Sequence, residues 1–163
     1  MHPRRLRILL PVFLAVILMG AFLWHYQRQG QVPGAIPTQA GTPVGTSDEM
    51  NLLARLIAAE AGTEPYEGQV AVGAVVMNRV RSPLFPSTIS GVVFEPWAFE
   101  SVSNGLIWQV TNLATASRAA VDALNGWDPT YGALFFWNPS KEVSPWIWTR
   151  TIITQIGNHV FAR

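Results

Sequence analysis

Hydrophobic and polar positions divide the chain into three parts. Residues 8–24 (ILLPVFLAVILMGAFLW) form an apolar run without a charge, whereas residues 27–46 are rich in glycine and proline and contain few large apolar side chains. Such a segment cannot bury enough surface to offset the entropy lost on ordering. From residue 47 onwards, apolar positions recur first with helical spacing and later in short runs typical of strands. The pattern predicts an N-terminal anchor (1–26), a flexible linker (27–46) and a folded domain (47–163).

The apolar run is long enough to cross a membrane. As a helix its 17 residues would span roughly 25 Å, close to the ~30 Å hydrocarbon core. Arg4, Arg5 and Arg7 precede it, which favours a cytoplasmic N-terminus, and Trp24 and Tyr26 follow where an interfacial aromatic belt is expected. A cleaved signal peptide is the alternative, although its apolar core is usually about 7–15 residues. We expect a single-pass membrane anchor with the domain on the outer side, or a secreted domain if the segment is cleaved.

The first helix of the domain has a defined start and stop. Thr46 and Glu49 form a T-x-x-E capping box, and Gly62 is a natural stop, so a helix is expected between them. Its apolar stripe consists of Leu53, Leu56 and Ile57. The next step of the same face is Glu60, so a carboxylate is expected in the last turn on the side that faces the core.

The position of Glu60 has a chemical consequence. Burial disfavours the charged form of a carboxylate and raises its pKa, and the partial negative charge at the C-terminal end of a helix acts in the same direction. A glutamate with a raised pKa is what a general acid near neutral pH requires. The alternative is a solvated glutamate at the helix edge, and periodicity alone does not decide between the two.

The rest of the domain is predicted to contain helices followed by strands. Gly73 lies in the second of these helices, where it would let a neighbouring element approach closely. Helices are expected at residues 66–80 and 115–125, with a short helix or turn at 88–94. Short strands are expected at 133–137 and within 152–162, which Gly157 and Asn158 interrupt. Because the strands come late, the order predicts an α+β fold, mostly helical with a small antiparallel sheet.

Charge and composition exclude several classes of function. Residues 1–47 hold four arginines and no acid, whereas the remainder holds seven basic and ten acidic residues, a net charge of −3 that disfavours nucleic acid binding. The chain has no cysteine, and His159 is the one histidine of the domain, which disfavours a zinc site and leaves that histidine a structural role. No H-E-x-x-H, G-x-S-x-G or phosphate-binding glycine motif occurs. We therefore expect no metal and no organic cofactor.

Acidic and aromatic residues remain as candidates for chemistry. Glu64 and Glu67 are interpreted as helix-start acids that favour the dipole, and Asp122 as a solvated residue. Glu100 follows Phe99 in an aromatic loop and is kept as a second carboxylate. Six of the seven tryptophans lie in the domain, and although core packing is their ordinary role, flat aromatic faces also suit sugar rings. An outward-facing, mildly acidic domain with one tuned glutamate and many loop tryptophans indicates polysaccharide cleavage.

Four segments of the domain carry a specific pattern. They are LLARLIAAEAGTEPYEGQVAVGAVVMNRVRSPLFPSTISGVVFEPWAF, ALNGWDPTYGALFFWNP, WIWTR and IGNHVFAR. Together they closely resemble the spore cortex-lytic enzyme (SleB-type) family of cell wall hydrolases, in order and spacing, over about residues 51–163. The resemblance implies a lysozyme-like α+β fold and a lytic transglycosylase that cleaves peptidoglycan strands between N-acetylmuramic acid and N-acetylglucosamine. It also implies that Glu60 is catalytic, because the family's glutamate lies in an A-E-A segment ahead of EPYEGQVA.

The chain departs from the family in two respects. Family members often carry a separate peptidoglycan-binding domain, whereas here an anchor and a linker are predicted in its place. The family often has Ser or Thr where this chain has Glu100, so this carboxylate either assists catalysis or faces solvent. The sequence does not decide between a spore and a vegetative role, and it identifies no accessory protein.

The resemblance and the residues together define a candidate site. Glu60 is the expected general acid and base, and Glu100 a second carboxylate that plain muramidase-type hydrolysis would require. Substrate-binding roles are assigned to Tyr66, Gln69, Trp97, Phe99, Asn138, Trp146 and Trp148. Asn138 is expected to hydrogen-bond an acetamido group, and core packing is the competing role for the aromatic residues. A membrane-tethered, non-enzymatic peptidoglycan-binding module is the alternative function.

Overall fold

The computed structural model describes residues 46–163. The predicted anchor at 1–26 and the predicted linker up to residue 45 lie outside the described residues. Within the described part, every helix is too short or too polar to span a lipid bilayer. The described residues include the whole of the predicted folded domain, 47–163.

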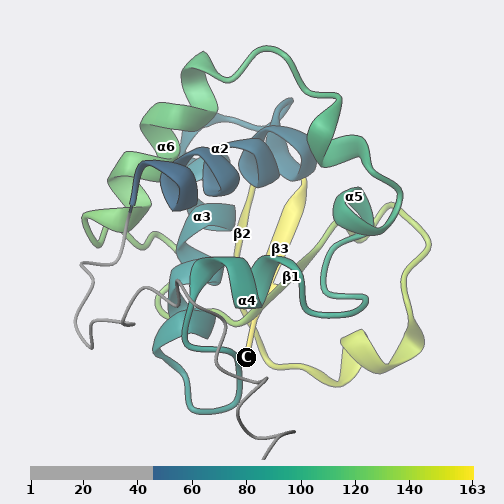
Figure 1. Cartoon of the computed structure of the whole chain (residues 1–163). Helices are drawn as coiled ribbons and strands as arrows, with labels where there is room; N and C mark the ends of the chain where they lie inside the picture. The colour runs from purple at the N-terminus through teal and green to yellow at the C-terminus, as the bar shows by residue number, and fades with distance from the viewer. Residues whose placement is uncertain (1–45) are drawn as a thin grey trace, which may run out of the picture. The chain divides into compact units, whose positions relative to one another are not determined.

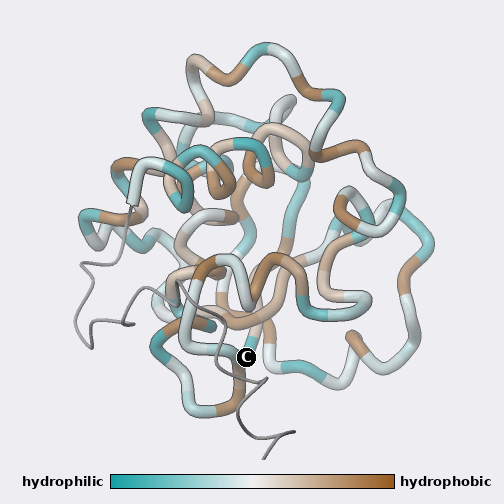
Figure 2. The backbone as a smooth tube through the Cα atoms, viewed as in Figure 1, coloured by the Kyte–Doolittle hydropathy of each residue, from teal (hydrophilic) through white to brown (hydrophobic). Residues whose placement is uncertain are grey.

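Three helices form the main body of the domain. They are α2 (Ser47–Ala61), α3 (Tyr66–Arg81) and α6 (Ala114–Leu124), and each packs against the other two (Figure 1). The capping box begins α2 as expected, because the Thr46 hydroxyl accepts the Glu49 backbone N–H at 3.3 Å. Hydrophobic and hydrophilic stretches alternate along the helices in Figure 2, and in α2 the buried residues Leu53, Leu56 and Ile57 follow the helical spacing that predicted this helix. The predicted helices are confirmed to within a residue or two.

Helix α3 is the central buried element. Its residues from Gly68 to Met77 are all buried. A Cβ atom at Gly73 would lie 2.9 Å from Ala123 Cβ and 3.0 Å from Ile57 Cδ1, so glycine here permits the close packing of all three helices. The close approach predicted at Gly73 is therefore present in the structure.

Shorter elements connect the helices to the sheet. They are α4 (Ile89–Val93), α5 (Glu100–Ser103) and the 3₁₀ helices η1 (Leu106–Trp108) and η2 (Pro145–Thr149). Thr88 caps α4 by accepting the Gly91 backbone N–H at 3.0 Å, so the segment predicted to be a short helix or turn is a helix. The aromatic segment at 96–100, predicted to be a loop, turns into α5 at its last residue.

A three-stranded antiparallel sheet completes the domain. Its strands are β1 (Phe135–Trp137), β2 (Ile152–Ile156) and β3 (His159–Ala162), and β3 lies in the middle. Phe136 pairs with Phe161, and Ile156 pairs with His159 across the turn formed by Gly157 and Asn158. The mostly helical architecture with a late, small antiparallel sheet agrees with the predicted α+β order.

A buried arginine joins helix α3 to the sheet. Arg79 Nε donates to the Leu134 carbonyl oxygen at 2.8 Å, just before β1. Its guanidinium lies 5.2 Å from the ring centres of both Phe85 and Phe99 and 5.8 Å from that of Phe135. Burial lowers the pKa of Arg79 to about 10, and the charge of Glu95 partly opposes this shift. The arrangement fixes Phe99, which precedes α5, against the core.

Candidate active site

Glu60 lies in the last turn of α2, at the end of the core-facing stripe. Leu53, Leu56 and Ile57 on this stripe are fully buried, whereas Glu60 is partly exposed because the helix ends one residue later. The backbone N–H of Ser101, in α5, donates to Glu60 Oε1 at 3.3 Å. Among the described residues no hydrogen bond engages the second carboxylate oxygen. The carboxyl group is thus held on one side and free to meet a substrate on the other.

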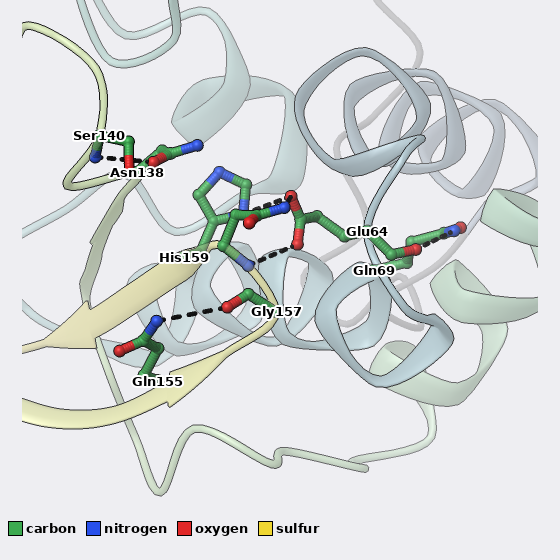
Figure 3. A network of polar contacts seen from close by, with 8 residues as sticks. Glu64, Gln69, Asn138, Ser140, Gln155, Gly157 and His159 are labelled. Carbon is green, nitrogen blue, oxygen red and sulfur yellow. Dashed lines mark hydrogen bonds and ion pairs between the residues drawn. The ribbon is translucent and has the colours of Figure 1, made fainter.

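A second glutamate organises the structure beside Glu60. Glu64 is buried, and its carboxylate accepts the backbone N–H of Asn158 at 2.8 Å and the Asn158 side-chain amide at 3.1 Å (Figure 3). Gln69, in the first turns of α3, donates to the Glu64 backbone carbonyl at 3.1 Å. His159 Nδ1 lies 3.9 Å from Glu64 Oε1. This cluster joins the start of α3 to the turn between β2 and β3.

The charges in this cluster act on one another. Burial raises the pKa of Glu64, but the two hydrogen bonds from Asn158 and the charges of His159 and Lys141 outweigh it, so the net pKa is below its ordinary value. Burial lowers the pKa of His159, against the opposing charges of Glu64 and Glu60. His159 is therefore favoured as a neutral imidazole beside an ionised Glu64.

Unpaired polar atoms gather around these two glutamates. Among the described residues, four buried side-chain polar atoms have no hydrogen-bond partner, namely Gln69 Oε1, Ser101 Oγ, Trp137 Nε1 and His159 Nδ1. Three of them belong to residues that contact Glu60 or Glu64 directly. Buried polar groups are nearly always paired, and an exception calls for an explanation such as a catalytic role. Their concentration makes this region the candidate functional part of the domain.

The predicted substrate-binding residues fall into several environments. Gln69 lies in the Glu64 cluster, and Asn138 lies near His159, with its side-chain oxygen accepting the Ser140 backbone N–H at 2.9 Å (Figure 3). Tyr66 instead donates its hydroxyl to Asp122 of α6 at 2.6 Å. The interpretation of Asp122 as merely solvated is therefore incomplete, because this hydrogen bond gives it a structural partner.

The aromatic candidates also differ in exposure. Trp97 is 90% exposed and has a positive φ of 65°, whereas Phe99 is only 4% exposed and packs in the core. Trp146 contacts Phe135 edge-on, and Trp148 packs edge-on against Trp137. Both are about half exposed. Their roles toward a substrate stay predictions.

Glu100, the predicted second carboxylate, is the first residue of α5. Its side chain is exposed, and it is the next residue, Ser101, whose backbone contacts Glu60. No signal in the sequence points to Ser101. Glu64 has a larger structural role than the helix-dipole effect expected of it, because it accepts hydrogen bonds from Asn158. The sequence gives no sign of this contact, since Asn158 lies 94 residues further along the chain. Within residues 46–163, no group of three or more His, Cys, Asp or Glu side chains could hold a metal ion.

The fold and this site define a class of protein. The family model described as Cell Wall Hydrolase matches residues 63–162, and the chain belongs to this family. The match runs from just before the start of α3 to the end of β3.

More specific similarities are to spore cortex-lytic enzymes. The chain is 49% identical over 137 residues to the spore cortex-lytic enzyme of Oceanobacillus iheyensis, covering 83% of this chain and 49% of that protein. It is 50% identical over 123 residues to that of Bacillus subtilis, covering 75% and 40% respectively. The chain thus matches about half the length, or less, of these curated relatives.

Solved structures give the same result for the fold. The crystal structure of the catalytic domain of the Bacillus cereus SleB protein matches with a TM-score of 0.68 and 45% identity. The catalytic domain of the germination-specific lytic transglycosylase SleB from Bacillus anthracis matches with a TM-score of 0.69 and 45% identity. Each match covers 81% of this chain and 100% of the other domain. The resemblance to the SleB-type family is confirmed.

Proposed function

We propose that the domain cleaves peptidoglycan glycan strands as a lytic transglycosylase, with Glu60 as the single general acid and base. The observation that carries the proposal is the Glu60 carboxyl group, which Ser101 holds at one oxygen while the other has no protein partner among the described residues. The structural match to the whole of a catalytic domain described as a lytic transglycosylase supports the reaction type. A lysozyme-like relationship of the fold is part of this proposal.

The reaction needs one carboxyl group in two protonation states. Protonated Glu60 donates its proton to the glycosidic oxygen, the bond from the muramic C1 breaks, and an oxocarbenium-like transition state develops on that sugar. The sugar's own 6-hydroxyl then attacks C1 while the Glu60 carboxylate takes the hydroxyl proton. A 1,6-anhydro end forms, and Glu60 returns to its protonated state. No second carboxylate takes part.

Plain hydrolysis is the second candidate, and the position of α5 is the observation that favours it. Glu100 is adjacent in sequence to Ser101, which touches Glu60, so a second acidic residue begins the same short helix. In a hydrolase, Glu100 would activate a water molecule or act as nucleophile. Glu100→Gln would then abolish cleavage, whereas a transglycosylase would retain it.

Product analysis on purified peptidoglycan tests the proposal. We expect anhydro-ended muropeptides by mass spectrometry, whereas reducing ends would indicate hydrolysis. Glu60→Gln should abolish fragment release, and Glu67→Gln, at an exposed position on α3, is the matched control that should release fragments normally. Normal turnover by Glu60→Gln would disprove the assignment. Binding to insoluble peptidoglycan without released fragments, even after long incubation, would favour the non-enzymatic binding module.

We also propose that residues 1–26 anchor the protein in the cytoplasmic membrane and that the domain faces the cell wall. The support is the apolar run at 8–24 with the arginines before it. Membrane fractionation together with mass spectrometry of the mature N-terminus tests this. An intact N-terminus in the membrane fraction supports an anchor, and a cleaved one in the medium supports secretion.

A further inference from the structure

The turn between β2 and β3 is fastened to the chain just before α3 by unusually close contacts. Gly157 has a positive φ of 59°, and a Cβ atom there would lie 2.2 Å from Glu64 Oε2 and 2.9 Å from Pro65 Cδ. Only glycine leaves room for the carboxylate at this point. Glu64 then binds Asn158 twice, through the backbone N–H and through the side-chain amide.

The fastened turn leads directly into His159. This residue is 7% exposed and packs edge-on against Phe136 and Phe161, with ring-centre distances of 5.4 Å and 6.4 Å. Its Nδ1 faces Glu64 Oε1 at 3.9 Å without another partner among the described residues (Figure 3). The charge of Glu60 also acts on the imidazole, which places it within electrostatic reach of the proposed catalytic group.

We propose that Glu64 is a positioning residue of the active site: its double hydrogen bond to Asn158 holds the β2–β3 turn and His159 against the end of α2, where Glu60 lies. We call the Glu64–Asn158 pair the turn clamp. The inference rests on the proposed function, because it supposes that Glu60 performs the chemistry. The clamp itself does not touch the substrate, and it acts through the placement of His159. A displacement of the order of 1 Å near a reacting group can lower a rate by about 100-fold.

Exchange of the hydrogen-bonding groups tests the clamp. Asn158→Asp sets a second carboxylate against Glu64, so the side-chain hydrogen bond becomes a repulsion between like charges. The double variant Glu64→Gln/Asn158→Asp restores the side-chain hydrogen bond with donor and acceptor reversed, and it keeps an oxygen for the backbone N–H. We expect the single Asn158→Asp change to lower kcat about tenfold with a smaller effect on KM. The double variant should recover to within about threefold of the wild type.

The controls separate positioning from simple stability. Asn51→Asp makes the same chemical change at an exposed position in α2 and should leave kcat unchanged. All rates are measured well below the melting temperature of each variant, with near-ultraviolet circular dichroism as a check on folding. If Asn158→Asp does not fold, Asn158→Ala removes only the side-chain hydrogen bond and should still lower kcat severalfold.

The outcomes distinguish the clamp from the proposed function. A wild-type kcat in the Asn158 variants, or a double variant no better than Asn158→Asp alone, would overturn the positioning role. The kcat assay measures the release of soluble peptidoglycan fragments, so it reports cleavage equally for a lytic transglycosylase and for a hydrolase. An inactive wild-type protein, or an active Glu60→Gln variant, would instead refute the proposed function.

Discussion

The closeness of Gly157 to Glu64 allows a quantitative prediction. Gly157→Ala adds a Cβ atom that would lie 2.2 Å from Glu64 Oε2, so the carboxylate must move. A left-handed conformation costs an L-residue about 1–2 kcal/mol. Displacing the carboxylate loses two hydrogen bonds to a charged group, each worth about 1.5–3 kcal/mol. We expect the free energy of unfolding to fall by about 4 kcal/mol or more.

A second glycine supplies the matched control. Gly105 also has a positive φ, 76°, but a Cβ atom there would meet nothing within 4 Å. Gly105→Ala should therefore cost only the conformational part, about 1–2 kcal/mol. Urea denaturation of both variants measures the difference, which reports the contact with Glu64. Equal losses of stability would show that the backbone conformation alone requires glycine at 157, and the reasoning about the clamp would be wrong.

Three further predictions concern packing and charge. Gly73→Ala should lower the free energy of unfolding by about 1–3 kcal/mol, because its Cβ would crowd Ala123; unchanged thermal stability would contradict this. Burial raises the pKa of Asp128, but hydrogen bonds from Thr130, Asn78 and Gly132 lower it overall, so its stabilisation is present at neutral pH and lost as pH falls through the lowered pKa. Asp128→Asn should therefore lower the free energy of unfolding at pH 7 and lower it progressively less as the pH falls. Urea denaturation at several pH values measures this loss, and an equal loss in neutral and strongly acidic buffer would contradict the prediction. Glu64→Gln removes a negative charge beside His159, so the His159 pKa should fall further below its ordinary value. NMR titration measures this pKa, to which the charges of Glu60 and Lys141 also contribute. An unchanged pKa would mean that Glu64 exerts no charge effect on His159.

Elements set by local periodicity could be predicted from the sequence. The capping box at Thr46 and the helical spacing of apolar residues define the limits of α2, and the same reasoning finds α3 and α6. Glu60 becomes a candidate in the same way, as the last step of a buried stripe, and independently through the family resemblance. These signals involve residues within one or two helical turns of one another.

Contacts between distant segments could not be predicted in this way. The hydrogen bonds from Asn158 to Glu64 join residues 94 positions apart, and those from Arg79 to Leu134 and Tyr66 to Asp122 join residues 55 and 56 positions apart. Each depends on how helices and strands pack, which no spacing along the chain encodes. Exposure of the aromatic candidates depends on the same packing, so Trp97 and Phe99 look alike in the sequence and differ in the fold.

The order of the strands has a consequence for how the domain matures. Strand β3, the last of the three in sequence, is the central one, and both β1 and β2 pair only with it. During synthesis, the two outer strands therefore have no mutual pairing to adopt until residues 159–162 emerge. The same four residues begin with His159, which lies 3.9 Å from the Glu64 carboxylate. Pairing of all three strands therefore waits for the last strand of the described domain, and a nascent chain that stops before residue 159 leaves β1 and β2 unpaired.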